Sequence, residues 1–286
     1  MPLASLVPAV LQTSIFLLVL SIGLTATPQD ALMMARHPGK LLRMVVAMNL
    51  VVPAFAVAAA LAFELHPTIE VAMVAIAISP VPPILPIKAM QTGPQRSYAV
   101  GLLAAASVLS VAYIPLVVMV LDRLFPADLA MSPLVVARAV SLSVLAPLAA
   151  GLLLRRLAPR LAERSARLVM RTAVALLVLA LLPVLVGAFP RVVSLIGNGT
   201  VLALAALVAA GLAAGHLLGG PAPEERSMLA LASASRHPAV AVALAHANFP
   251  EDRLVVPAVL LYLIVCMVVT TPYLLWSRRR AGLPGA

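Results

Sequence analysis

The sequence predicts an all-α polytopic membrane protein, and its composition is the first reason. Hydrophobic residues make up 63% of the 286 residues, charged residues only 10%, and the mean hydropathy is +1.10. A soluble domain carries about 45–50% apolar and about 25% charged residues, so most of this apolar surface is expected to face lipid. The single cysteine, Cys266, excludes an intrachain disulfide and is interpreted as an inert apolar residue.

The length of the apolar stretches is the second reason. A helix needs about 20 predominantly apolar residues to cross the hydrocarbon core. Hydropathy over windows of about 19 residues predicts nine such spans. The spans cover Leu3–Leu24, Leu41–Leu65, Thr68–Met90, Tyr98–Leu121, Leu134–Leu154, Leu168–Phe189, Thr200–Leu218, Glu225–Ala247 and Leu254–Trp276.

The distribution of basic residues predicts the orientation. Fourteen of the 20 lysines and arginines lie on one side of the predicted membrane and four on the other. The positive-inside rule then places the N-terminus outside and the C-terminus in the cytoplasm, as expected for a multi-pass protein of the cell (inner) membrane. The basic loops lie beside the lipid bilayer, so anionic lipid rather than nucleic acid explains the net charge of +10.

Two of the predicted spans are interrupted near their middles. The interruptions contain Pro80, Pro82, Pro83 and Pro86 in the third span (near 80–88) and Arg236, His237 and Pro238 in the eighth (near 233–238). Each proline removes a backbone donor and clashes with the preceding turn, so these prolines are expected to shape unwound backbone. Each interruption begins about twelve residues into its span, near the bilayer centre.

The third and eighth spans cross in opposite directions, which predicts an inverted repeat. Residues 1–124 form the first repeat, 125–165 a connecting span with a basic loop, 166–277 the second repeat, and 278–286 a basic tail. Interrupted helices at matching positions are typical of the midplane substrate site of secondary transporters. The alternative is a pair of proline kinks with no ligand role.

Three segments carry a family resemblance. They are the first loop, SIGLTATPQDALMMARHPGKLLR, and the interrupted stretches SPVPPILPIKAM and SASRHPAVAVALAHANFP. In these segments and in the order of its spans, the chain resembles the bile acid:sodium symporter family in its nine-span form. The resemblance implies a core domain with two crossing broken helices, a panel domain, and a substrate cleft between them that opens by alternating access. It also implies organic anion substrates, such as bile acids or smaller carboxylates, commonly carried with sodium.

The sequence departs from that family at the expected sodium ligands. If Arg236 and His237 take the positions of the Gln and Asn in the family's second crossover, the Glu that binds sodium falls on Ala232. The Ser-Asn pair of the first crossover falls near Leu85 and Pro86. These residues offer no side-chain oxygen, so no cofactor is expected and sodium coupling is left open.

Arg236 is the leading candidate for binding an anion. All ten acidic residues lie at span ends or in loops, which leaves Arg236 without a carboxylate partner at its depth. A buried arginine at the bilayer centre costs about 2.5–3.5 kcal/mol, and a bidentate carboxylate or sulfate ligand would offset that cost. The alternative is a structural arginine that donates to carbonyl groups freed by the broken helices.

The other candidate substrate-binding residues each have two interpretations. His237 either couples transport to protons or hydrogen-bonds a free carbonyl, and Lys88 either binds the anion or extends to the membrane interface. Ser233 and Ser235 either bind substrate or permit close helix packing, and Asn49 either faces substrate or joins helices. Tyr113 is interpreted as an interfacial or packing aromatic residue.

These patterns predict a secondary transporter of organic anions. Sodium-independent transport, either proton-coupled or facilitative, is an alternative with the same fold, and an anion channel or sensor is an alternative from another class. An enzyme is not expected, because the sequence has no buried acid pair, metal-ligand cluster, nucleophile elbow or phosphate loop. The sequence carries no signal for the oligomeric state.

Overall fold

Helices account for all regular secondary structure in the described part of the chain. The computed structural model describes residues 3–82, 93–124, 134, 138 and 140–280. In the first half, the elements are α1 (Leu3–Thr25), α2 (Pro28–Ala31), α3 (Met33–Arg36), α4 (Pro38–Val45), the π-helix η1 (Val46–Val51), α5 (Val52–Ala62), α6 (Pro67–Ile78) and α7 (Gly93–Leu124). In the second half, they are the π-helix η3 (Ser141–Leu145), α9 (Ala146–Leu157), α10 (Pro159–Ser194), α11 (Thr200–Leu218), α12 (Pro223–Ala234), α13 (Pro238–Asn248) and α14 (Val255–Arg280).

Six of the described helical stretches are long and apolar enough to cross a membrane. They cover Pro38–Ala62, Arg96–Arg123, Pro159–Ser194, Thr200–Leu218, Pro223–Asn248 and Val255–Ser277. Ala9–Thr25 and α6 are shorter apolar helices. Large apolar side chains, among them Val186, Leu202 and Leu217, are exposed on the outside of the bundle. Such a surface is suited to contact with lipid.

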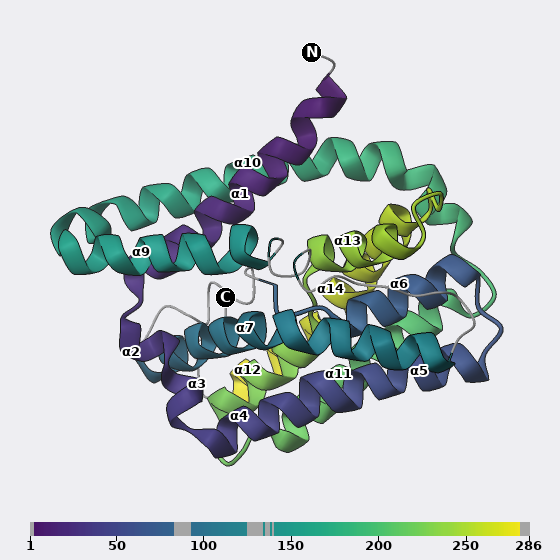
Figure 1. Cartoon of the computed structure of the whole chain (residues 1–286), viewed down its shortest axis with the longest axis horizontal. Coiled ribbons are helices and arrows are strands. Elements are labelled where there is room, and N and C mark those ends of the chain that lie inside the picture. The colour runs from purple at the N-terminus through teal and green to yellow at the C-terminus, as the bar shows by residue number, and fades with distance from the viewer. Residues whose placement is uncertain (1–2, 83–92, 125–133, 135–137, 139, 281–286) are drawn as a thin grey trace.

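The helices form two groups that lie against each other (Figure 1). In the first group, α1 packs along both α9 and α10. In the second group, α6 contacts α5, α13 and α14, and α11 packs along α12. Contacts of α1 and α7 with η3, and of α10 with α14, join the two groups.

Glycine allows close backbone approach at two helix contacts. Gly23 of α1 meets Gly151 of α9, where an added Cβ on Gly23 would lie 2.9 Å from the Gly151 Cα. On α11, Gly211, Gly215 and Gly219 share one face at four-residue spacing and meet the backbone of α12. Small residues at this spacing are a common device for packing membrane helices. The α11 glycines thereby hold α12 and its C-terminal end close against α11.

Charged groups tie the short helices after α1 to the starts of α7 and α12. The Asp30 carboxylate accepts the Thr27 backbone N–H at 2.7 Å and also the Ser97 hydroxyl. Burial raises the pKa of Asp30, but the hydrogen bonds from Ser97 and Thr27 outweigh burial, and the pKa lies below its ordinary value. Nearby, the Lys40 ammonium lies 2.6 Å from the Glu225 carboxylate.

The α11–α12 contact gives a first prediction. In Gly215→Ala, the new methyl group overlaps the backbone of Ala230, and we expect an overpacking cost of about 1–3 kcal/mol. The melting temperature of the detergent-purified protein should fall. Gly187→Ala is the matched control, because an added Cβ there meets no atom within 4 Å and alanine is the better helix former. Equal melting temperatures for the two variants would contradict the close packing of α11 on α12.

Candidate functional site

The first helix interruption follows α6. Ser79 has an extended backbone with φ −70° and ψ 152°, as expected for a residue that precedes a proline. The Ser79 N–H donates to the Ile76 carbonyl at 3.0 Å, and the Ser79 hydroxyl donates to the Ala75 carbonyl at 2.7 Å. These bonds close the end of α6. The carbonyl groups of Ser79 and Pro80 are left without a helical donor.

The second interruption separates α12 from α13. Ser235 and His237 both have extended backbones, and α13 begins at Pro238. Pro238 lacks the N–H that would have bonded the Ala234 carbonyl in a continuous helix. The hydroxyl of Tyr262, on α14, donates to that carbonyl instead, at 2.5 Å.

The two interruptions contact each other directly. The backbone N–H of His237 donates to the carbonyl of Pro80 at 2.8 Å. Both residues are buried. Unwound backbone inside a membrane protein is tolerated where protein or a water-filled cavity satisfies its polar groups, and here each interruption satisfies part of the other.

Arg236 lies at this crossing with 3% of its surface exposed. Its guanidinium donates to three backbone carbonyls: Nε to Ser233 at 3.2 Å, Nη1 to Ser79 at 3.1 Å, and Nη2 to Met48 at 2.6 Å. The three carbonyls come from α12, from the residue after α6, and from η1. No described carboxylate forms an ion pair with Arg236. These contacts match the structural role given above as the alternative for Arg236, and its anion-binding role stays a prediction.

The π-helix η1 supplies the third carbonyl. The Val52 N–H donates to Ala47 rather than to Met48, so Met48 loses its α-helical donor. Pro53 has no N–H, so it cannot donate to the Met48 carbonyl. For the same reason the Asn49 carbonyl lacks its α-helical donor. The Tyr113 hydroxyl, on α7, donates to the Asn49 carbonyl at 2.6 Å.

Six carbonyls at the crossing that lack a helical donor accept a hydrogen bond from another group. The six are those of Met48, Asn49, Ser79, Pro80, Ser233 and Ala234. Arg236 satisfies three of them, two tyrosine hydroxyls satisfy two, and the His237 backbone satisfies one. A buried carbonyl without a donor costs about 1–3 kcal/mol, so this network holds the broken backbone together.

Two side chains at the crossing have no such partner. Both ring nitrogens of His237 and the hydroxyl of Ser233 are buried and make no hydrogen bond in the described part of the chain. The His237 side chain therefore does not bond a free carbonyl in this conformation. Its two nitrogens are available to a proton, to water or to a ligand.

The remaining predicted residues are only partly accounted for. The Ser235 hydroxyl lies 3.6 Å from the Cys266 sulfur, and the half-buried Asn49 contributes its carbonyl to the crossing. Pro82 is buried after α6. Lys88, Pro83 and Pro86 lie outside the described residues.

Sequence reasoning missed the two tyrosines that serve the crossing. Tyr113 is a hydrogen-bond donor to the backbone, not only a packing aromatic as interpreted above. Tyr262 has the same function on α14. The sequence carries one signal for this function. Pro53 lies four residues after Asn49, and Pro238 lies four residues after Ala234. Each proline lacks the N–H that would bond that carbonyl in a helix, so the carbonyl needs another donor. The sequence does not reveal which side chain reaches that carbonyl.

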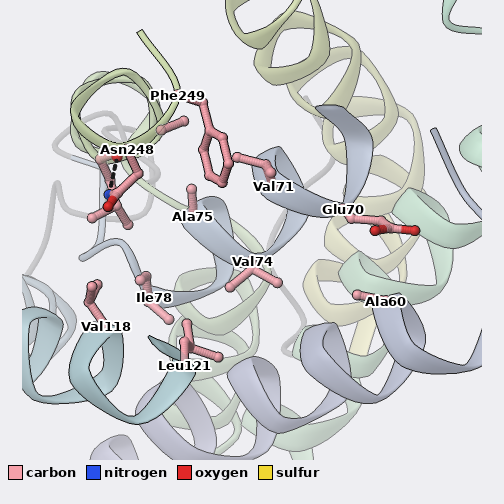
Figure 2. Close-up of a pocket in the computed structure, with 12 residues that line it drawn as sticks. Ala60, Glu70, Val71, Val74, Ala75, Ile78, Val118, Leu121, Asn248 and Phe249 are labelled. Carbon is pink, nitrogen blue, oxygen red and sulfur yellow. Dashed lines mark hydrogen bonds between the residues drawn. The ribbon is translucent and has the colours of Figure 1, made fainter. Parts of the chain in front are cut away.

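An apolar cleft lies apart from these groups, between α5, α6, α7 and α13 (Figure 2). Its walls include Val71, Val74 and Phe249. Glu70 is the charged residue among those that line it, and the Asn248 amide donates to the Leu244 carbonyl at 3.0 Å. A cleft whose charge is a carboxylate does not suit an anion.

Comparison with known proteins identifies the family. The sequence profile of the sodium bile acid symporter family matches residues 13–195. The chain belongs to this family. Members of the sodium bile acid symporter family are membrane transporters rather than enzymes, so the chain is a multi-pass membrane protein of a transporter family. The match covers the first interruption, and the second lies beyond it. Comparison with individual curated proteins finds no match.

The described part of the crossing does not fit the sodium ion that the family description names. Three freed carbonyls that could bind a cation already accept the Arg236 guanidinium. Ala232, at the position predicted for the family's Glu, is fully buried and offers no side-chain oxygen. The described residues also contain no group of three or more His, Cys, Asp or Glu side chains that could hold a metal.

The tyrosine contacts give a second prediction. Tyr262→Phe removes the hydroxyl donor from the Ala234 carbonyl and leaves it the longer, weaker bond from the Cys266 thiol at 3.7 Å, and we expect a loss of about 1–3 kcal/mol in stability. Thermal melting in detergent measures this loss. In the control, Tyr98→Phe, a buried tyrosine outside the crossing loses its hydroxyl, and the ring beneath Lys40 is kept. A Tyr262→Phe protein as stable as the control would show that the carbonyl does not need the hydroxyl donor.

Proposed function

We propose that this protein is a secondary transporter that moves organic anions across the cell (inner) membrane by alternating access. The observation that carries the proposal is the hydrogen bond between the two helix interruptions, from His237 N–H to the Pro80 carbonyl. Discontinuous helices that meet inside a transporter form the site around which its two halves move. Membership of the sodium bile acid symporter family supports the same conclusion.

The proposal includes nine spans, with the N-terminus outside and the C-terminus in the cytoplasm. Six apolar helices, two shorter ones and the partly described fifth span are compatible with that count. The repeats are 1–124 and 166–277, joined by 125–165. The group of α1, α9 and α10 would be the panel domain and the other group the core domain, with substrate bound between them.

The charge at the crossing favours an anionic substrate. Arg236 is positive and has no carboxylate partner among the described residues. The α13 N-terminus, which begins at the crossing, adds partial positive charge because its first N–H groups have no helical acceptors. We propose that the anion binds beside this N-terminus and is contacted by the His237 ring, Ser233 and Ser235. Lys88, outside the described residues, stays a predicted substrate-binding residue. Bile-acid-like molecules and small carboxylates both have the required charge.

The proposed transport does not use sodium, because the freed carbonyls already have donors. Proton coupling through His237 is favoured by one observation, the absence of any described partner for either ring nitrogen. Arg236 precedes His237 in the chain, and no described carboxylate pairs with Arg236. Facilitative exchange is the alternative if His237 does not titrate.

Uptake into proteoliposomes tests the function. We expect radiolabelled organic anions to enter with saturable kinetics, and preloaded unlabelled anion to accelerate that entry by exchange. Non-saturable flux with a measurable current would identify a channel instead. Binding without entry would identify a sensor. Either result would overturn the proposal.

His237→Gln tests the proton coupling. We expect this variant to lose accumulation driven by a pH gradient while it keeps anion exchange, because glutamine preserves hydrogen bonding but does not titrate near neutral pH. His246→Gln is the matched control, since His246 is exposed on α13, the helix that follows His237. If His237→Gln accumulates anion in response to a pH gradient as the wild type does, His237 does not couple protons.

A further inference from the structure

The carbonyl groups around Arg236 form a cage that is suited to a cation. The oxygens of Met48, Ser79 and Ser233 come from three separate helical segments and surround one buried guanidinium, each accepting from a different nitrogen. Backbone carbonyls freed at helix interruptions are the groups with which transporters and channels bind monovalent cations. In this chain the positive group inside the cage is a side chain.

Three features distinguish this arginine from an ordinary buried ion pair. The guanidinium has no described carboxylate partner, so the neutral carbonyl dipoles stabilise its charge. Each of its three nitrogens donates to a carbonyl, and two of these carbonyls belong to segments distant in sequence, at Met48 and Ser79. The contacts therefore do what a bound ion does, which is to join the broken ends of different helices through a central charge.

We propose that the Arg236 guanidinium is a tethered cation, which occupies the position of a free coupling cation and makes the transporter independent of sodium. This inference rests on the proposed transport function and specifies how its ion site is filled. A tethered cation cannot dissociate, so the sodium gradient has no means of driving the cycle. In every conformation in which Arg236 donates to these three carbonyls, the helical segments that carry them stay connected.

The proposal predicts that removing the charge opens a cation site. In Arg236→Gln the three carbonyls lose their cation and gain a side-chain amide oxygen beside them, an oxygen set that a sodium ion can use. Arg236→Lys is the matched control, because its ammonium keeps the charge and supplies three donors. The side chain at position 236 should then determine whether sodium binds.

The experiment is thermal melting of detergent-purified protein in sodium chloride and in choline chloride at equal ionic strength, without substrate. We expect sodium to raise the melting temperature of Arg236→Gln by about 2–4 °C when its concentration is about ten times the dissociation constant. Wild type and Arg236→Lys should melt at the same temperature in both salts. A folded Arg236→Gln protein that shows no sodium-specific stabilisation would overturn the proposal.

If Arg236→Gln does not fold, thermal melting of the wild type in different salts tests the proposal instead. Sodium-specific stabilisation of the wild type would overturn the proposal, because a filled cage cannot accept a second cation. Equal melting in sodium, potassium and choline salts supports it. Melting involves no substrate, so failure of this inference is distinct from failure of anion uptake, which would refute the proposed function.

Discussion

The hydrogen bonds from Arg236 to three backbone carbonyls are the interaction on which the centre of this structure depends. Prolines and a π-helix free carbonyl groups on three segments that would otherwise be regular helix. One guanidinium bonds Met48, Ser79 and Ser233 together, and the His237 backbone completes the connection to Pro80. Without these donors, the crossing would hold several unsatisfied polar groups where water is scarce.

The rest of the bundle positions the pieces of that crossing. Glycines on α11 allow α12 to approach closely, and α12 carries the second interruption at its C-terminal end. Tyr113 and Tyr262 extend from α7 and α14 to carbonyls that proline has freed. Six carbonyls at the crossing accept hydrogen bonds, whereas the outer faces of the helices are apolar. The His237 ring and the Ser233 hydroxyl have no partner among the described residues, and we propose that the anion and the proton bind here.

Much of this arrangement is visible in the sequence. Composition and span length predicted an all-helical membrane protein, and the segments that contain Pro80 and Pro238 predicted where two helices are interrupted. The role of Arg236 could not be assigned, because an arginine without a carboxylate partner is equally compatible with a bound anion and with free carbonyls. That choice depends on where the Met48 carbonyl points. That carbonyl is free because the Val52 N–H donates to Ala47, a π-helical bond that the sequence analysis did not predict.

The positive charge at the crossing is built into the chain, and we propose that no sodium ion travels with the substrate. Radioactive sodium and labelled organic anion, followed together in the same proteoliposomes, test this claim directly. We expect anion influx with no anion-dependent sodium influx. Sodium entry in fixed proportion to the anion would contradict the account and would require a cation site outside the carbonyl cage of Arg236.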